Sequence, residues 1–207
     1  RWNVIAVTAI ALYALARGGR EAETVLRETV FNTVSIFTGT GLVSADLAGW
    51  GPFAFAVLFL VGLIGGCTSS TGCSVKVFRW LILWEAVKVQ IRRIRQPDAV
   101  NTLRYDGRAV GADVLDAVIF FFAAFVLTFG CLAVALALAG LSFQTSVTAA
   151  WTAIANVGPA YGPEVHPTGA LLAFPAAAKT VMIAGMLLGR LELLPVYVLF
   201  LRQFWRA

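Results

Sequence analysis

The sequence predicts an all-α integral membrane protein built from helix–pore-loop–helix repeats around an ion pore. Three observations lead to this expectation. The chain has 207 residues, of which 59% are hydrophobic and 13% are charged, whereas soluble domains contain about a quarter charged residues. Two short apolar segments end in glycine-containing turns, at Thr38–Leu42 and Asn156–Pro159. Between them lies a basic stretch, and basic residues mark the cytoplasmic loops of membrane proteins.

The first half begins with a helix, a short helix and a turn. Trp2–Ala16 is apolar but short for a membrane span of about 20 residues, so we expect the natural chain to extend upstream. A short pore helix is predicted within Val30–Phe37 and breaks into the turn Thr38–Leu42. Non-helical backbone persists in a membrane only where protein buries it or where it lines a water-filled cavity. The turn is therefore predicted to be a re-entrant loop whose carbonyl oxygens face an ion.

The last helix of this half is predicted to be interrupted within the membrane. Apolar residues run over Pro52–Ile64 and resume over Val75–Ile91. Between them, Gly65–Ser74 is rich in glycine and hydroxyl residues, which weaken helices and offer the backbone other hydrogen bonds. A tight turn outside the membrane is the alternative interpretation. A phosphate-binding loop is excluded because Cys73 stands where that motif needs a lysine.

The second half repeats this plan. Asp113–Ala139 is the clearest span, Phe143–Ala155 is a short helix that ends in the second turn, and Leu171–Phe200 is predicted to be one long final span.

Residue spacing relates the two halves. Gly158 follows Gly41 by 117 residues, and the same shift places Arg190 opposite Cys73 of the interrupted helix. The basic stretch and the basic C-terminus are expected on the cytoplasmic side, so both turns enter from outside. Two repeats of the same orientation are expected around an axis along the membrane normal.

Eight of the 16 Lys and Arg residues fall between Lys76 and Arg108. They divide the chain into a first repeat (1–92), a basic cytoplasmic linker (93–112) and a second repeat (113–207). A nucleic-acid surface is the alternative for such charge, but the run is short and lacks interleaved aromatic residues. We therefore expect contact with membrane lipid and not with nucleic acid.

In these motifs the sequence resembles the C-terminal half of the Trk/Ktr/HKT superfamily of potassium transporters, of the bacterial TrkH and KtrB type. The most specific pieces are the two turns, the interruption Ile64–Lys76 and the segment Met186–Glu192. Members carry four helix–pore–helix repeats, so this chain would supply the third and fourth of an expected four. It departs from the family where Leu42 replaces a common phenylalanine and where Cys67 and Cys73 lie in the interruption.

The resemblance implies potassium as the transported ion, with no organic cofactor, and a multi-pass protein of the bacterial inner (plasma) membrane. The negative C-terminal ends of the short helices would favour a cation, and K⁺ would bind at Thr40, Gly41, Val157 and Gly158. The full set of filter candidates is Thr38, Gly39, Thr40, Gly41, Leu42, Asn156, Val157, Gly158 and Pro159.

A gate is expected beneath this filter. Its candidate residues are Gly65, Gly66, Thr68, Ser69, Ser70, Thr71, Gly72 and Arg190. An intramembrane arginine would repel cations and could bond to the loop. The alternative is a structural arginine held by Glu192 or by carbonyl groups. Lys179, about three helical turns earlier, would either brace the pore helix or extend to the outer interface.

The family also implies partners. Its members work with a cytosolic nucleotide-binding regulatory subunit of the TrkA/KtrA type, for which Lys88–Arg108 is a candidate docking area, and they pair into homodimers. An intramembrane enzyme is not expected, because no His, Asp or Glu accompanies the Ser and Cys residues of the interruption. A non-conducting scaffold remains the other alternative. Passive conduction and symport with another ion are both left open.

Overall fold

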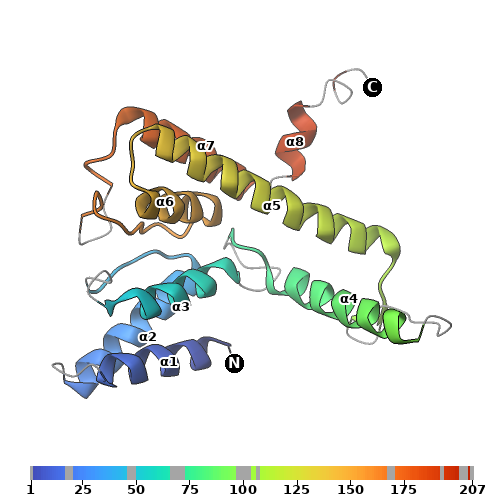
Figure 1. Ribbon diagram of the computed structural model, residues 1–207, viewed down its shortest axis with the longest axis horizontal. Helices are drawn as coiled ribbons and strands as arrows, with labels where there is room; N and C mark the ends of the chain where they lie inside the picture. Colours follow the sequence, from blue (N-terminus) through green and yellow to red (C-terminus); the bar gives the residue numbers. More distant parts are fainter. Residues whose placement is uncertain are drawn as a thin grey trace.

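The computed structural model describes residues 2–16, 21–45, 50–65, 73–96, 104–105, 108–166, 171–191, 194–200 and 205. Within them the chain is almost entirely helical (Figure 1). The helices are α1 (Trp2–Ala16), α2 (Ala22–Thr38), α3 (Pro52–Leu63), α4 (Val77–Arg95), α5 (Ala112–Leu138), α6 (Phe143–Ala155), α7 (Ala176–Arg190) and α8 (Leu194–Phe200). The linker adds a small antiparallel hairpin, β1 (Arg104–Tyr105) with β2 (Arg108–Ala109).

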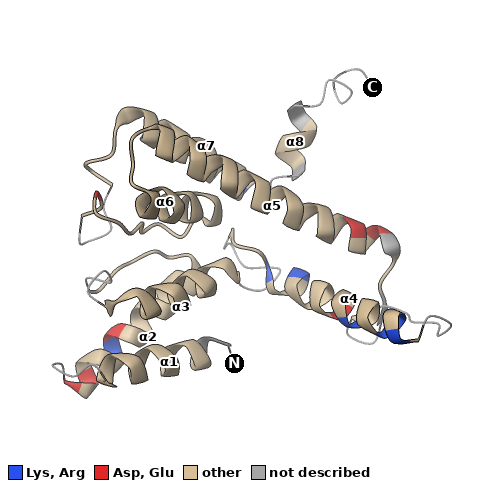
Figure 2. Ribbon diagram, in the orientation of Figure 1, with Lys and Arg blue, Asp and Glu red and all other residues tan. Residues whose placement is uncertain are grey.

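The helices form two groups with the same internal order. In the first group α1 packs against α2 and α3, and in the second α5 packs against α6 and α7. Figure 1 shows the two groups one above the other, with α4 extending away beneath the first half of α5. Lys and Arg gather toward the far end of α4 (Figure 2). The predicted plan of helix, short helix, turn and helix is thus found twice.

The short helix of the first group begins earlier than predicted. We expected it within Val30–Phe37, whereas α2 begins at Ala22. The polar residues before Val30 include Glu23, which lies in the first turn of α2, where an acidic side chain stabilises the helix dipole. The short helix of the second group has the predicted bounds. Its N-cap, Ser142, accepts a hydrogen bond from the backbone N–H of Thr145.

The predicted interruption of the third helix is present. Helix α3 begins with Pro52 and ends at Leu63, and α4 starts at Val77. Between them Ile64 and Val75 form an isolated bridge, and the Gly65 N–H donates to the Val75 carbonyl at 2.8 Å. The candidate gate residues Gly66, Thr68, Ser69, Ser70, Thr71 and Gly72 lie outside the described residues.

The prediction of one continuous final span is wrong. Helix α7 begins after Pro175 and ends at Arg190, and α8 starts at Leu194. Pro195 explains the end, because a proline in a continuing helix would lack an N–H donor and its ring would clash with the carbonyl four residues earlier. That carbonyl belongs to Leu191, the residue that caps α7.

Among the described residues, one helix passes a length and composition test for a membrane span. This is Asp113–Leu138 of α5, with a mean hydropathy of 2.6. Two further apolar helices, Val4–Ala16 and Pro52–Leu63, are shorter.

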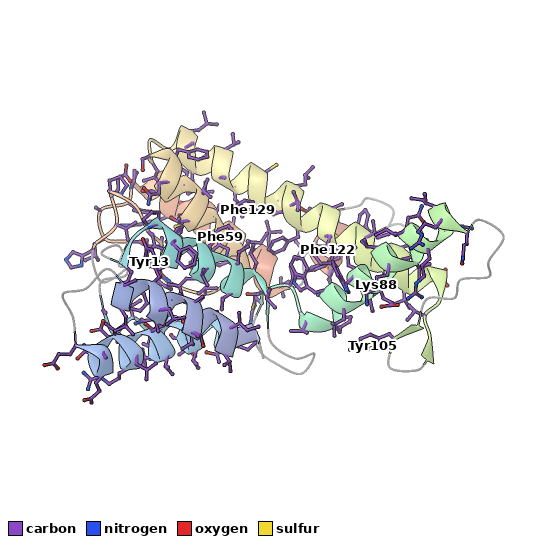
Figure 3. The ribbon with its side chains drawn as sticks, turned by 60° about the horizontal axis from the view of Figure 1, so that its bottom comes forward. Tyr13, Phe59, Lys88, Tyr105, Phe122 and Phe129 are labelled. Atoms are coloured by element: carbon purple, nitrogen blue, oxygen red, sulfur yellow. The ribbon has the colours of Figure 1, made fainter. Side chains whose placement is uncertain are left out.

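Trp151 of α6 joins the two groups. Its side chain is fully buried and belongs to the core of the first group, beside Ile36 and Leu58. Its ring lies 5.2 Å, between centroids, from that of Phe59 on α3. Phe59 and Phe129 of α5, both labelled in Figure 3, pack against this same core. The short helix of the second repeat is therefore anchored in the first.

This contact depends on a glycine. A Cβ atom at Gly62 of α3 would lie 2.2 Å from the Trp151 ring, and overpacking of this kind costs about 1–3 kcal/mol. Gly62→Ala should therefore lower the thermal unfolding temperature of the detergent-solubilised protein. Gly130→Ala is the matched control. A Cβ atom at that helical glycine would have open space around it, and alanine favours a helix more than glycine does. An equal response of the two variants would contradict the packing argument.

Candidate functional site

The two turns have the same backbone geometry. Each begins with a residue in the left-handed region, Gly39 (φ 75°) after α2 and Asn156 (φ 51°) after α6. The Gly39 N–H donates to the Ile36 carbonyl at 3.2 Å, and the Asn156 N–H donates to the Ala153 carbonyl at 3.3 Å. Such caps satisfy carbonyl groups that a helix end leaves without partners.

The correspondence continues into the next residue. The Thr40 N–H donates to the Ser35 carbonyl at 3.0 Å, and the Val157 N–H donates to the Thr152 carbonyl at 3.2 Å. Donors and acceptors in the second turn all follow their counterparts by 117 positions. The spacing read from the sequence therefore describes a real structural repeat.

The two turns also lie against one another. Gly41 (φ 72°) and Gly158 (φ 119°) both have positive φ. A Cβ atom at Gly41 would lie 2.0 Å from the Val157 carbonyl oxygen, and one at Gly158 would lie 3.4 Å from the Gly41 Cα. Glycine is needed for the backbone conformation at both positions and, at Gly41, for the close approach as well. The fold thus brings together the four residues predicted to hold an ion.

A hydroxyl side chain of each short helix hydrogen-bonds to the backbone of the turn that follows it. The Ser35 hydroxyl donates to the Leu42 carbonyl at 2.8 Å. In the other repeat the Gly158 N–H donates to the Thr152 hydroxyl at 2.7 Å. Ser35 and Thr152 occupy equivalent positions, and both are buried. Each of these two side chains therefore satisfies one backbone group of its turn.

A second pair of polar contacts ties the chain that leaves each turn back to its short helix. Asn32 donates to the Ser44 hydroxyl at 2.8 Å and accepts from the Ser44 N–H at 3.1 Å. The Thr148 hydroxyl accepts from the Tyr161 N–H at 3.1 Å and donates to the Tyr161 carbonyl. These supporting residues are not among the site residues predicted from the sequence. Their signal was the presence of polar residues within short apolar helices, which is costly unless they are hydrogen-bonded.

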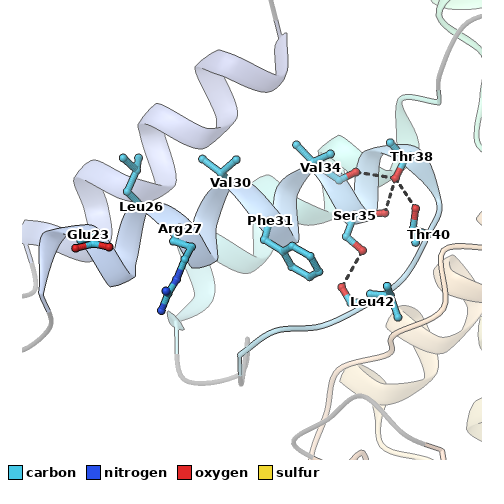
Figure 4. A pocket seen from close by; sticks show the side chains of 10 residues that line it. All are labelled: Glu23, Leu26, Arg27, Val30, Phe31, Val34, Ser35, Thr38, Thr40 and Leu42. Carbon is cyan, nitrogen blue, oxygen red and sulfur yellow. Dashed lines mark hydrogen bonds between the residues drawn. The ribbon is translucent and has the colours of Figure 1, made fainter.

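The first turn also faces a cavity of about 650 Å³ (Figure 4). It is lined by the exposed side of α2, from Glu23 to Thr38, and by the turn itself. The Thr38 and Thr40 hydroxyls lie 2.8 Å apart at its end. The lining is mostly apolar, with Val30 and Val34 exposed to it.

Arg190 contacts the residue that precedes α4 by a few positions, Cys73. Its Nη1 donates to the Cys73 sulfur at 3.4 Å, so residues at equivalent positions of the two repeats are in contact. Of the gate candidates, Gly65 and Arg190 are among the described residues. The alternative partner of Arg190, Glu192, lies outside the described residues.

Lys179 donates to the Leu172 carbonyl at 3.2 Å. This bond to the loop before α7 favours the interpretation that Lys179 extends to the outer interface over the interpretation that it braces the pore helix.

Glu164 secures the loop beyond the second turn. Its carboxylate accepts hydrogen bonds from the Thr145 hydroxyl, from the Ser142 hydroxyl at 2.8 Å and from the Ser142 N–H at 3.1 Å. The hydrogen bond from Thr145, followed by those from Ser142, lowers the pKa of Glu164 below its usual 4.5. The N-terminal end of α6 also favours a negative charge there.

Comparisons with known proteins agree with this arrangement. The family model described as TrkH, a cation transport protein, matches residues 19–206. The Trk system potassium uptake protein TrkI of Halomonas elongata is 36% identical over 203 residues, which cover 98% of this chain and 41% of that protein. The Trk system potassium uptake protein TrkH of Salmonella typhimurium is 32% identical over 185 residues, covering 89% and 38%.

A solved structure is also similar. The crystal structure of the potassium transporter TrkH from Vibrio parahaemolyticus superimposes with a TM-score of 0.88 at 31% identity, covering 99% of this chain and 43% of that one. The chain spans about two fifths of the length of the relatives it matches.

Glu164 gives a pH-dependent prediction. Its folded-state pKa is depressed below the ordinary value of 4.5, so its contribution to stability is present above that value and is lost as pH falls through the folded pKa. Glu164→Gln should therefore lower the unfolding temperature at pH 7, and the difference from the unmodified protein should shrink in acid. Glu85→Gln, at a surface pair with Lys88, is the control. A difference for Glu164→Gln that stays constant down to pH 3 would refute this role.

Proposed function

The chain belongs to the TrkH family of cation transport proteins, and we propose that it forms half of a potassium-conducting pore in the bacterial inner membrane. Its helical fold is that of a solved potassium transporter. The observation that carries the proposal is the meeting of two equivalent glycine turns at the C-terminal ends of α2 and α6. Helix C-termini and backbone carbonyls are the groups that stabilise a partly dehydrated cation.

The exposed side of α2 supports a larger pore. Leu26, Val30 and Val34 are apolar and exposed along this helix, beside the cavity that reaches the first turn. An exposed apolar surface next to a filter is suited to pack against a further repeat of the same, longer polypeptide. We infer that two more repeats complete the ring of carbonyl groups. In this arrangement residues 1–92 and 113–207 act as the third and fourth repeats, joined by the linker 93–112.

Below the filter, we assign the interruption and Arg190 to a barrier. The support for this assignment is the contact between Arg190 and Cys73, a residue that directly follows the candidate gate residues in the sequence. A fixed cation near the ion path raises the energy of a passing K⁺. Movement of the Gly65–Ser74 loop, or of the arginine, would lower this barrier.

Partners follow from the basic end of α4. Arg92, Arg93 and Arg95 lie in its last turn and are exposed. We propose that this cytoplasmic end of α4 and the linker bind a TrkA-like nucleotide-binding regulatory subunit. Membrane lipid would surround the helices, and the complete protein would form a homodimer.

The filter can be tested through its two glycines. Gly41→Ala introduces a clash with the Val157 carbonyl, whereas Gly158→Ala imposes a strained φ. Both should reduce rubidium uptake by liposomes that contain the complete natural polypeptide by about tenfold or more, or admit sodium, because left-handed backbone costs a residue with a Cβ about 1–2 kcal/mol.

Gly140→Ala is the matched control for the glycine test. Gly140 also has a positive φ (92°), but a Cβ atom there would have open space around it. The uptake and the selectivity of the Gly140→Ala variant should therefore equal those of the unmodified protein. Unaltered selective flux in the Gly41 and Gly158 variants would reject the filter. The absence of cation flux from the unmodified protein would favour a scaffold.

The barrier can be tested through Arg190. A unit charge about 4 Å from a cation repels it by about 1 kcal/mol even in water, so Arg190→Ala should raise potassium flux by about fivefold or more. Lys179→Ala serves as the control, because that lysine binds a loop carbonyl before α7 and should leave flux unchanged. Equal flux in Arg190→Ala and the unmodified protein would refute the barrier.

A further inference from the structure

Asn156 has an unusual backbone conformation. It is the one non-glycine residue with positive φ among the described residues. Glycine occupies the equivalent position, Gly39, in the first turn. Left-handed backbone disfavours every residue that carries a Cβ, although asparagine tolerates it better than most. The side chain of Asn156 is therefore expected to contribute something that a glycine cannot.

The side chain of Asn156 binds the next helix. Its Nδ2 donates to the Met186 carbonyl of α7 at 3.0 Å. Met186 lies one helical turn before Arg190, and in a regular helix its carbonyl also accepts from the Arg190 N–H. The asparagine thus holds the backbone of the turn that carries the arginine.

Gly189 makes this approach possible. A Cβ atom there would lie 2.0 Å from the Ile154 carbonyl oxygen and 2.9 Å from Asn156 Nδ2. The last turn of α7 is therefore seated directly on the C-terminal end of α6. The first repeat has no equivalent side-chain bond from its turn, since Gly39 has no side chain.

We propose that Asn156 is a positioning residue that fixes the depth of Arg190 relative to the second glycine turn. The inference rests on the proposed function, in which Arg190 is a barrier to cations. Asn156 joins filter and barrier into one rigid unit in the second repeat. Loss of its side chain frees the end of α7 and lets the guanidinium leave Cys73.

The flux test uses Asn156→Gly, which keeps the backbone conformation and removes only the side chain. The variant should raise potassium flux by about fivefold, as loss of the arginine charge should, while the preference for potassium over sodium is retained. In the double variant Asn156→Gly/Arg190→Ala the flux should equal that of Arg190→Ala alone.

Thr152→Ala is the matched contrast. Thr152 supports the same turn by accepting a hydrogen bond from the Gly158 N–H. Among the described residues its side chain makes no hydrogen bond to α7, so its loss should reduce selectivity without increasing potassium flux. Additive effects in the double variant, or a loss of selectivity in Asn156→Gly, would overturn the positioning role and leave a purely local role in the filter.

A second measurement follows Arg190 without measuring transport. With Cys67 and Cys131 replaced by serine, Cys73 is labelled by a cationic and by a neutral methanethiosulfonate of similar size. Arg190 next to Cys73 repels the cationic reagent, so Asn156→Gly should raise the ratio of cationic to neutral rate by about fivefold, corresponding to removal of one charge at about 4 Å in water. Arg190→Ala should give the same ratio.

The two measurements separate the two hypotheses. If Arg190→Ala leaves flux unchanged but Asn156→Gly still changes the labelling ratio, the barrier is wrong and the positioning role stands. If Arg190→Ala changes the ratio and Asn156→Gly does not, the positioning role is refuted while the barrier survives.

Discussion

The structure depends on satisfying irregular backbone where water is scarce. A membrane protein can place non-helical peptide groups at depth only if its own atoms supply the missing hydrogen bonds. Here each short helix ends in a left-handed cap, and a buried hydroxyl group, Ser35 or Thr152, completes the turn behind it. The backbone of both turns is thus held by hydrogen bonds within the protein.

Close packing between the halves follows from that requirement. Two turns can meet only if their backbones approach, and Gly41 removes the Cβ that would prevent it. Gly62 lets Trp151 enter the core of the first group, and Gly189 lets α7 rest on the end of α6. Small residues at such contacts are typical of helix association in membranes, where close van der Waals packing replaces the hydrophobic effect. The glycines therefore determine how the repeats fit together as well as how the chain turns.

Sequence reasoning predicted the parts that depend on local composition. The bounds of α1 and α6, the two turns and the interruption before α4 follow from apolar runs broken by Gly, Ser and Thr. The early start of α2 was not predicted, because the residues before Val30 are largely polar and lie outside the apolar run. The division between α7 and α8 was missed although Pro195 signalled it. The bond between Asn156 and Met186 joins residues 30 positions apart, and no spacing rule reveals such a contact.

The contact between Cys73 and Arg190 has a consequence for how the proposed pore can vary. These residues occupy the same place in two copies of one structural unit, yet one is a neutral thiol and the other a cation. In a channel of identical subunits, every substitution occurs once in each subunit. The net charge around the pore therefore changes by as many elementary charges as there are subunits. Repeats joined in one polypeptide diverge independently, so the potential along the axis can be adjusted by one elementary charge at a time.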